Sequence, residues 1–223
     1  MYLQIDGINK RYGKNRVLEN ISIGAEKGKC IGLLGANGSG KSTLLNILAG
    51  IINADSGAFS LDGVDLLKNK KARSNSVAYV PQGISLIREL TAYDNLRMWY
   101  TKEEIAYSLN NSVLGKLGIA EFLKKPVSKM SGGMQKRLSI ACAVALNPSV
   151  LLLDEPSAAL DLVCKNIIYE YISDFCSKGG VVIIATHDLG ELPLCDELCI
   201  LKGGQLLPYS YNGKVSELVE LLK

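Results

Sequence analysis

The chain has 223 residues, of which 48% are hydrophobic and 21% charged, and its formal net charge at pH 7 is +3. These values are typical of a globular protein, and they exclude a disordered chain, a collagen-like chain and a small disulfide-held scaffold. A charge excess this small gives no reason to expect a nucleic-acid partner.

Apolar runs are short throughout the sequence. The runs at 150–153 and 181–185 fall well below the roughly 18 residues that a membrane-spanning helix needs. The N-terminus lacks the basic segment followed by an apolar one that marks a signal peptide. We therefore expect a cytoplasmic protein. The six cysteines form no CxxC pair, so we expect neither a metal site nor a disulfide from them.

The first third of the chain is rich in predicted β-strands. They cover residues 2–6, 17–23, 30–34 and 58–61. Residues 41–49 predict a helix that ends at Gly50. Residues 77–80 predict a further buried strand, which stops at Pro81 because proline has no backbone N–H for the ladder.

The middle of the chain, residues 84–147, predicts a small helical lobe. Two sequence patterns resemble capping boxes at helix starts, Thr91 with Asp94 and Thr101 with Glu104. Four apolar residues then recur every four positions and predict a helix that ends before Gly118: Ile105, Leu109, Val113 and Leu117.

Strands and helices alternate in the last third. Apolar runs at 150–154 and 181–186 flank a helical apolar stripe between 160 and 175, and a terminal helix is expected from Lys214. Runs of this kind predict a parallel sheet covered by helices. We expect a single domain, with 1–83 and 148–223 in the α/β core and 84–147 in a helical subdomain.

Residues 35–43 read GANGSGKST and follow the predicted strand 30–34. The pattern is that of a phosphate-binding loop, whose amides wrap a polyphosphate at a helix N-terminus. We expect Lys41 to hold the β- and γ-phosphates and Ser42 to bind Mg²⁺. The residues expected to contact the nucleotide here are Gly35, Asn37, Gly38, Ser39, Gly40, Lys41, Ser42 and Thr43.

Two adjacent carboxylates end the apolar run at 150–154. Ligands bind at the carboxyl ends of strands in open α/β sheets. We expect Asp154 to reach the Mg²⁺, and Glu155 to orient the water that attacks the γ-phosphorus. With the phosphate loop, this pair indicates a nucleotide hydrolase.

Residues 130–137 read MSGGMQKR. Together with the phosphate-binding loop and the acidic pair, this sequence makes the chain resemble the nucleotide-binding subunit of an ATP-binding-cassette (ABC) transporter over nearly all its length. The resemblance implies ATP as the nucleotide and a P-loop NTPase core with a mostly parallel sheet, an antiparallel β-subdomain and a small helical lobe.

The resemblance also assigns roles to single residues. Tyr12 matches the aromatic residue that stacks on adenine, and Gln82 the glutamine that couples the Mg²⁺ site to the membrane partner. His187, the one histidine of the chain, matches a switch residue that contacts the γ-phosphate. Residues 157–161, ending in Asp161, match a loop that crosses the dimer interface.

The resemblance implies a mechanism that needs a second ATPase subunit, identical or different. Ser131, Gly132 and Gly133 of one subunit would cap the γ-phosphate held by Lys41 of the other. The motion would pass to transmembrane permease subunits, through residues 86–89 and Trp99, so that the chain is peripheral on the inner face of the membrane.

The pattern departs from the family's L-S-G-G-Q at Met130 and Met134. Methionine for glutamine removes a possible ribose contact. The sequence S-G-G-M before a basic pair looks like the variant of drug, antibiotic and ion exporters, which favours export over import. Two alternatives stay open: a non-transport ATPase of this fold that acts in DNA repair or on ribosomes, and a regulatory module that binds ATP without hydrolysing it.

Overall fold

Two β-sheets form the framework of the protein. The computed structural model describes residues 2–83 and 85–222; residues 1, 84 and 223, and with them the predicted boundary at 84, lie outside the described residues. The antiparallel sheet has the order β2-β1-β4-β5, and its strands are β1 (Leu3–Tyr12), β2 (Asn15–Ala25), β4 (Ser56–Leu61) and β5 (Val64–Asp65).

The second sheet has six strands in the order β10-β9-β3-β8-β7-β6. They are β3 (Cys30–Leu34), β6 (Val77–Val80), β7 (Val150–Asp154), β8 (Val181–Thr186), β9 (Glu197–Lys202) and β10 (Gln205–Tyr209). Strands β9, β3, β8, β7 and β6 pair in parallel, and β10 pairs antiparallel with β9. The predicted fold, with a mostly parallel sheet and an antiparallel β-subdomain, is confirmed.

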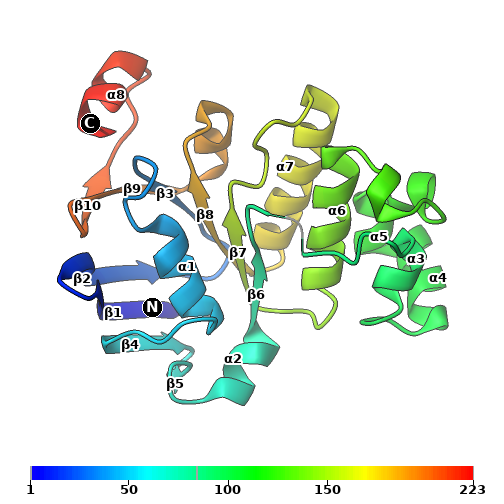
Figure 1. Cartoon of the computed structure of the whole chain (residues 1–223), viewed down its shortest axis with the longest axis horizontal. Helices are drawn as coiled ribbons and strands as arrows, with labels where there is room; N and C mark the ends of the chain where they lie inside the picture. Colours follow the sequence, from blue (N-terminus) through cyan, green and yellow to red (C-terminus); the bar gives the residue numbers. More distant parts are fainter. Residues whose placement is uncertain (1, 84, 223) are drawn as a thin grey trace.

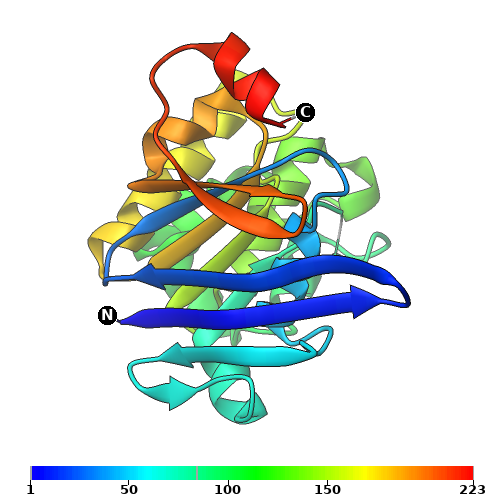
Figure 2. The ribbon, with the colours of Figure 1, turned by 90° about the vertical axis from the view of Figure 1, so that its left-hand side faces the viewer.

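Helices separate the sheets and cover the outer face of the larger one (Figure 1). Helix α1 (Lys41–Ala49) lies between the two sheets, and Figure 2 shows the antiparallel sheet in front of this layer. Helices α6 (Gly132–Ala143) and α7 (Leu162–Ser177) cover the other face of the parallel sheet. The remaining helices are α2 (Lys70–Ser76), α3 (Ala92–Leu96), α4 (Lys102–Asn111), α5 (Val113–Lys116) and α8 (Val215–Leu222), with 3-10 turns at Ile119–Phe122, Val127–Lys129 and Leu189–Leu194.

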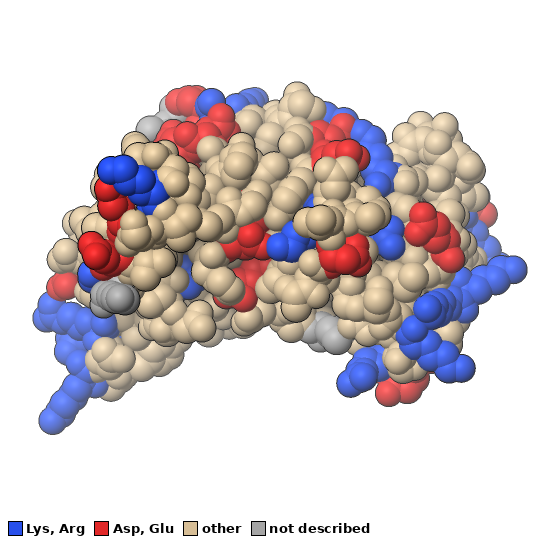
Figure 3. All heavy atoms as spheres, turned by 90° about the horizontal axis from the view of Figure 1, so that it is seen from above, with Lys and Arg blue, Asp and Glu red and all other residues tan. Residues whose placement is uncertain are grey.

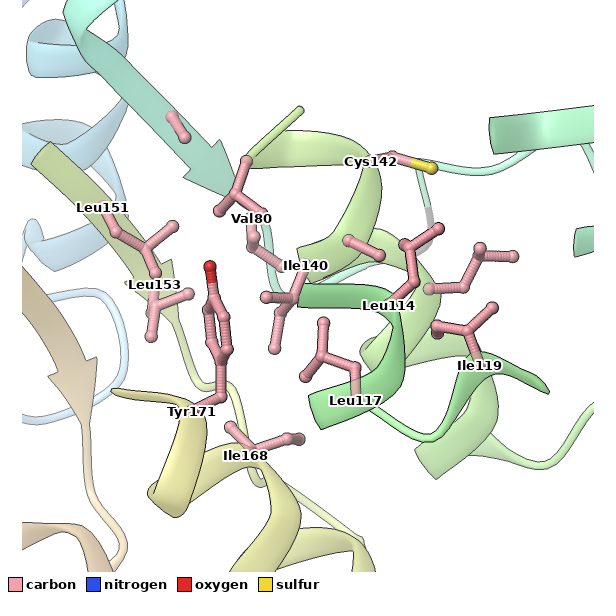
Figure 4. Close-up of a cluster of buried hydrophobic side chains, with 14 of the residues drawn as sticks. Val80, Leu114, Leu117, Ile119, Ile140, Cys142, Leu151, Leu153, Ile168 and Tyr171 are labelled. Atoms are coloured by element: carbon pink, nitrogen blue, oxygen red, sulfur yellow. The ribbon is translucent and has the colours of Figure 1, made fainter. Parts of the chain in front are cut away.

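Strand β7 is buried on both faces, and alternate residues serve two different cores. Leu151 and Leu153 belong to the core shared with α6, α7 and the helical lobe, which Figure 4 shows from the sheet to Leu114. Val150 and Leu152 belong to the core shared with α1 and the antiparallel sheet. The period of two along the strand therefore fixes the position of β7 from both sides.

Both predicted capping boxes in the helical lobe are present. Thr91 caps α3 with Asp94, and Thr101 caps α4 with Glu104. The prediction of one helix through the four-residue apolar repeat is wrong, because the chain breaks between α4 and α5. Ser112 has φ −147° and ψ −148°, outside the helical region, and the Ser108 hydroxyl accepts the Leu114 amide at 3.2 Å. A serine side chain thus competes with the helical hydrogen bonds.

Several strands differ from their predicted extents. Strands β1 and β2 are longer than predicted, because they form a hairpin in which Tyr12 pairs with Asn15. The hairpin of β9 and β10 was not predicted, and it closes one edge of the parallel sheet. The terminal helix from Lys214 is confirmed as α8, which begins at Val215.

The surface carries both signs of charge. On the face shown in Figure 3, basic side chains extend from both ends, and acidic and basic side chains are interspersed across the rest of the face. This distribution agrees with the small net charge of +3. Among residues 2–83 and 85–222, every helix is too short or too polar to cross a lipid bilayer.

We predict that Leu152→Ala lowers the free energy of unfolding by about 2–5 kcal/mol, because it leaves a cavity at a site with no exposed surface. Denaturant unfolding of the purified chain measures this. The matched control is Leu207→Ala on β10, where the side chain is half exposed. Equal losses in the two variants would contradict the role of Leu152 in the core.

Candidate functional site

The loop at 35–40 joins β3 to α1, and the N-terminus of α1 faces a cavity. Gly40 precedes α1 with φ 109°, and a Cβ there would lie 3.0 Å from the side chain and carbonyl of Val17. Only glycine fits this backbone without strain. The amides at the start of α1, together with the helix dipole, favour an anion at this end.

Lys41, the first residue of α1, is almost fully buried. Its Nζ donates to the carbonyl oxygens of Gly35 at 2.7 Å and Ala36 at 3.1 Å. Burial lowers the pKa of Lys41, and the nearby carboxylates of Glu155 and Asp154 oppose that effect. The ammonium therefore lies inside the loop, between its carbonyls and the acidic ends of the sheet.

The predicted phosphate loop and three of the predicted site residues meet around one cavity of about 520 Å³. Its lining comes from β2, the loop and α1, and the ends of β6, β7 and β8: Val17, Asn37, Gly38, Gly40, Lys41, Ser42, Thr43, Gln82, Glu155 and His187. Of the predicted loop residues, Gly35 and Ser39 are not part of this lining, and a Cβ added to Gly35 would lie 2.5 Å from the Ser39 hydroxyl oxygen.

Glu155 is the centre of the site. It follows β7 with φ 48°, an uncommon backbone for a residue other than glycine. Its Oε2 accepts a hydrogen bond from Gln82 Nε2 at 2.7 Å, and its Oε1 lies 3.1 Å from His187 Nδ1. Gln82 and His187 follow β6 and β8, the two strands that flank β7. Three neighbouring strands therefore deliver three side chains to one point.

Asp154 ends β7 and is buried beside this point. The Tyr79 hydroxyl donates to its Oδ2 at 3.3 Å, and burial together with the Asp154 charge raises the pKa of Tyr79. The available donors here are the Ser42 hydroxyl, the Gln82 amide and the Asp154 carboxylate, and oxygen donors suit Mg²⁺. Within the described ranges no cluster of three or more His, Cys, Asp or Glu side chains could hold a metal. The donor set fits an ion that phosphate oxygens also ligate.

Tyr12 does not line the cavity. It lies at the end of β1 with about half of its surface exposed, and Lys10 Nζ lies 5.5 Å from the centre of its ring. Val17 of the next strand lines the cavity instead.

The remaining predicted residues lie at a second surface, formed by the starts of α6 and α7, and do not line the cavity. Ser131 caps α6, and its Oγ accepts the Met134 amide at 3.3 Å. Asp161 caps α7, where its Oδ1 accepts the Cys164 amide at 2.8 Å, and these bonds lower the pKa of Asp161. A Cβ on Gly133 would lie 2.3 Å from the Cys164 sulfur, so glycine lets the two helix starts meet. Ser131 and Gly132 are exposed at this surface.

Sequence reasoning missed Glu191, a fully buried carboxyl group after His187. Its Oε1 accepts the Ser157 amide at 3.1 Å, and its Oε2 has no hydrogen-bond partner among the described residues. The Ser157 hydroxyl donates to Asp188 at 3.3 Å, and Asp188 pairs with Lys165. Nothing in a single sequence marks this glutamate as buried. It ties residues 157–161 to the segment that carries His187.

Comparisons with known proteins identify the family of the chain. The family model described as ABC transporter matches residues 18–158. Nod factor export ATP-binding protein I of Ralstonia nicotianae is 33% identical over 97% of this chain and 68% of its own length. Lantibiotic transport ATP-binding protein SrtF of Streptococcus pyogenes is 34% identical over 95% of this chain and 92% of its own length.

Two solved structures share the fold over almost the whole chain. An ATP-binding subunit of an ABC transporter has a TM-score of 0.86 at 25% identity and covers 100% of both chains. A dimeric ATP-binding cassette in a post-hydrolysis state, bound to ADP and Pi, has a TM-score of 0.81 at 27% identity and covers 95% of this chain and 100% of that one. The chain belongs to the ABC transporter family and is an ATPase domain of that family.

We predict that Glu191→Gln stabilises the protein increasingly as the pH rises above about 4.5. Burial raises the pKa of Glu191, so the folded chain holds this proton more tightly than the unfolded chain. Stability from that proton is complete below the unfolded pKa of 4.5 and is lost as the pH rises toward the folded value. Glutamine keeps the acceptor for Ser157 and does not ionise.

Unfolding free energies of both proteins between pH 4 and pH 8 test this, with the Glu191→Gln curve rising relative to the wild-type curve. A constant difference across that range would show that Glu191 titrates equally in the folded and unfolded chains.

Proposed function

We propose that the chain binds and hydrolyses ATP with Mg²⁺ as the motor subunit of an ABC exporter, and that closure of an ATPase dimer drives cargo movement by separate membrane subunits. The observation that carries this proposal is the cavity in which Lys41, Glu155 and His187 meet. The names of the two relatives, one in Nod factor export and one in lantibiotic transport, support export.

The phosphate loop and Lys41 would bind the polyphosphate. Lys41 would exchange its bonds to the Gly35 and Ala36 carbonyls for phosphate oxygens, which offer a full negative charge. Ser42, Gln82 and Asp154 would hold the Mg²⁺, which when bound neutralises phosphate charge. Tyr12 would stack on the adenine from the end of β1.

Glu155 would orient and polarise the attacking water. The hydrogen bond from Gln82 and the contact with His187 fix both oxygens of this carboxylate, so that it needs no rearrangement to face the cavity. His187, which is more than half exposed at the cavity, would reach the γ-phosphate.

A second ATPase subunit would complete the site. Ser131, Gly132 and Gly133 lie at the start of the twelve-residue helix α6, outside their own cavity. The helix start offers free amides and a favourable dipole end to a phosphate on another subunit. Asp161 lies beside them at the start of α7. We assign the starts of α6 and α7 to the dimer interface. The solved cassette bound to ADP and Pi is dimeric, which supports this arrangement.

The permease would dock on a groove of about 320 Å³ between the core and the helical lobe. The predicted docking residues Leu86 and Trp99 line it together with Met98 and Leu146, and the last three are at least half exposed. Exposed apolar surface of this kind marks interaction sites. Docking there would place the chain on the cytoplasmic face of the membrane, with residues 84–147 acting as the helical subdomain that receives the contact.

We predict that Glu155→Gln retains ATP affinity but lowers ATP turnover by at least about 100-fold, because the amide cannot polarise the attacking water. Lys41→Ala is the comparison: it should weaken ATP binding by about tenfold or more, since a charged hydrogen bond is lost. Titration with ATP and a phosphate-release assay separate the two effects. Normal turnover in Glu155→Gln would remove Glu155 from the mechanism.

We predict that Trp99→Asp abolishes recovery of a polytopic membrane protein with the chain from detergent-solubilised membranes, because it places a charge in the apolar groove. ATP affinity of the purified variant should match the wild type. Tyr107→Asp is the control, since Tyr107 is exposed on α4 and does not line the groove. Recovery of ribosomes or nucleic acid with the wild-type chain would instead favour a non-transport ATPase.

A further inference from the structure

The two residues of the basic pair after the S-G-G-M sequence, Lys136 and Arg137, make contacts with different parts of the structure. Arg137 turns into the helical lobe, where it is buried: its Nη1 donates to the Leu117 carbonyl at 3.1 Å, and its guanidinium stacks over the Phe122 ring at 4.9 Å. Arg137 therefore holds the lobe together. Lys136 turns the other way, toward the parallel sheet.

Lys136 joins α6 to the segment that follows β6. Its Nζ donates to the Pro81 carbonyl at 3.0 Å and makes a longer contact of 3.4 Å with the Gln82 carbonyl. An ammonium can donate three hydrogen bonds, and bonds from a charged donor are stronger than those from a neutral one. One side chain of the helical lobe thus fixes the backbone at Gln82.

The Gln82 side chain extends from this backbone to Glu155. Its Nε2 donates to Glu155 Oε2 at 2.7 Å, so Gln82 contacts α6 through its backbone carbonyl and Glu155 through its side chain. The same helix begins at Ser131 and Gly132 on the second surface. Residues 131–136 therefore connect that surface to the hydrolysis site of their own chain.

The positive charge of Lys136 lies close to negative charges at the end of the sheet. Burial lowers the pKa of Lys136, and Asp154, Glu155 and Glu191 oppose the shift, so the ammonium lies in the field of three carboxylates at the end of the sheet. A neutral side chain of the same length would leave the Pro81 carbonyl without this donor and would remove a positive charge beside the site.

We propose that Lys136 is a positioning residue that holds Gln82 against Glu155 and links the start of α6 to hydrolysis in the same chain. The proposal rests on the proposed ATPase mechanism. It requires that Lys136 act through Gln82, and that requirement distinguishes it from general stabilisation of the lobe.

The experiment is a double-mutant cycle on the turnover of the full chain. Lys136→Met should lower kcat by about tenfold and change the affinity for ATP by less than about twofold, because the phosphate loop does not contact Lys136. In a Gln82→Ala background the same substitution should lower kcat hardly at all, since the positioned side chain is already absent. Lys136→Arg, which keeps the charge and the donors, should retain most of the wild-type kcat.

Lys124→Met, which removes an exposed lysine of the same lobe, is the control and should leave kcat unchanged. Additive effects of Lys136→Met and Gln82→Ala would overturn the proposal, as would a lower melting temperature with normal kcat. If Glu155→Gln also leaves turnover normal, the proposed mechanism fails first. If Glu155→Gln abolishes turnover and Lys136→Met has no effect, the mechanism stands and the role of Lys136 falls.

Discussion

The parallel pairing of β7 between β6 and β8 is the constraint on which the site depends. In this register Leu153 lies opposite Val80 on one side, and Asp154 lies opposite Ala185 on the other. The residues that follow the three strands therefore leave the sheet at nearly the same level. A slip of one residue in β7 would turn its buried side chains to the opposite faces and would move Glu155 away from its partners.

The two hydrophobic cores maintain this register. Because β7 and β8 are apolar on both faces, neither strand can slide without exposing residues on one side or overpacking the other. Because the strands are held rigidly, residues whose burial or backbone conformation costs free energy can be placed at the strand ends. Lys41 is buried at the start of α1, Asp154 is buried at the end of β7, and Glu155 has a left-handed backbone. Each of these is unfavourable alone, and each faces a group of opposite charge or a hydrogen-bond donor.

The sequence predicted the parts of the site that depend on local pattern. The phosphate loop needs glycine at fixed positions and a helix after it, and the acidic pair needs an apolar strand before it, so both are visible along the chain. Contacts between distant segments are not visible in this way. The burial of Glu191 beside Ser157, and the break at Ser112 where Ser108 competes for a helical amide, depend on what packs nearby. The roles of Tyr12 and Asp161 came from resemblance alone, and their geometry here is that of a strand end and a helix cap.

Two internal connections lead from outside the cavity to Glu155 and His187. One begins on α6 and passes through Lys136 and Gln82. The other begins in the loop at 157–161 and passes from Ser157 to Glu191, in the short helix that follows His187. Both start beside the helix ends that carry Ser131 and Asp161. If a second subunit covers that surface, its binding would act on the carboxylate through Gln82 and on the segment that carries the histidine through Glu191. Hydrolysis in one chain would then depend on contacts that the chain does not make alone.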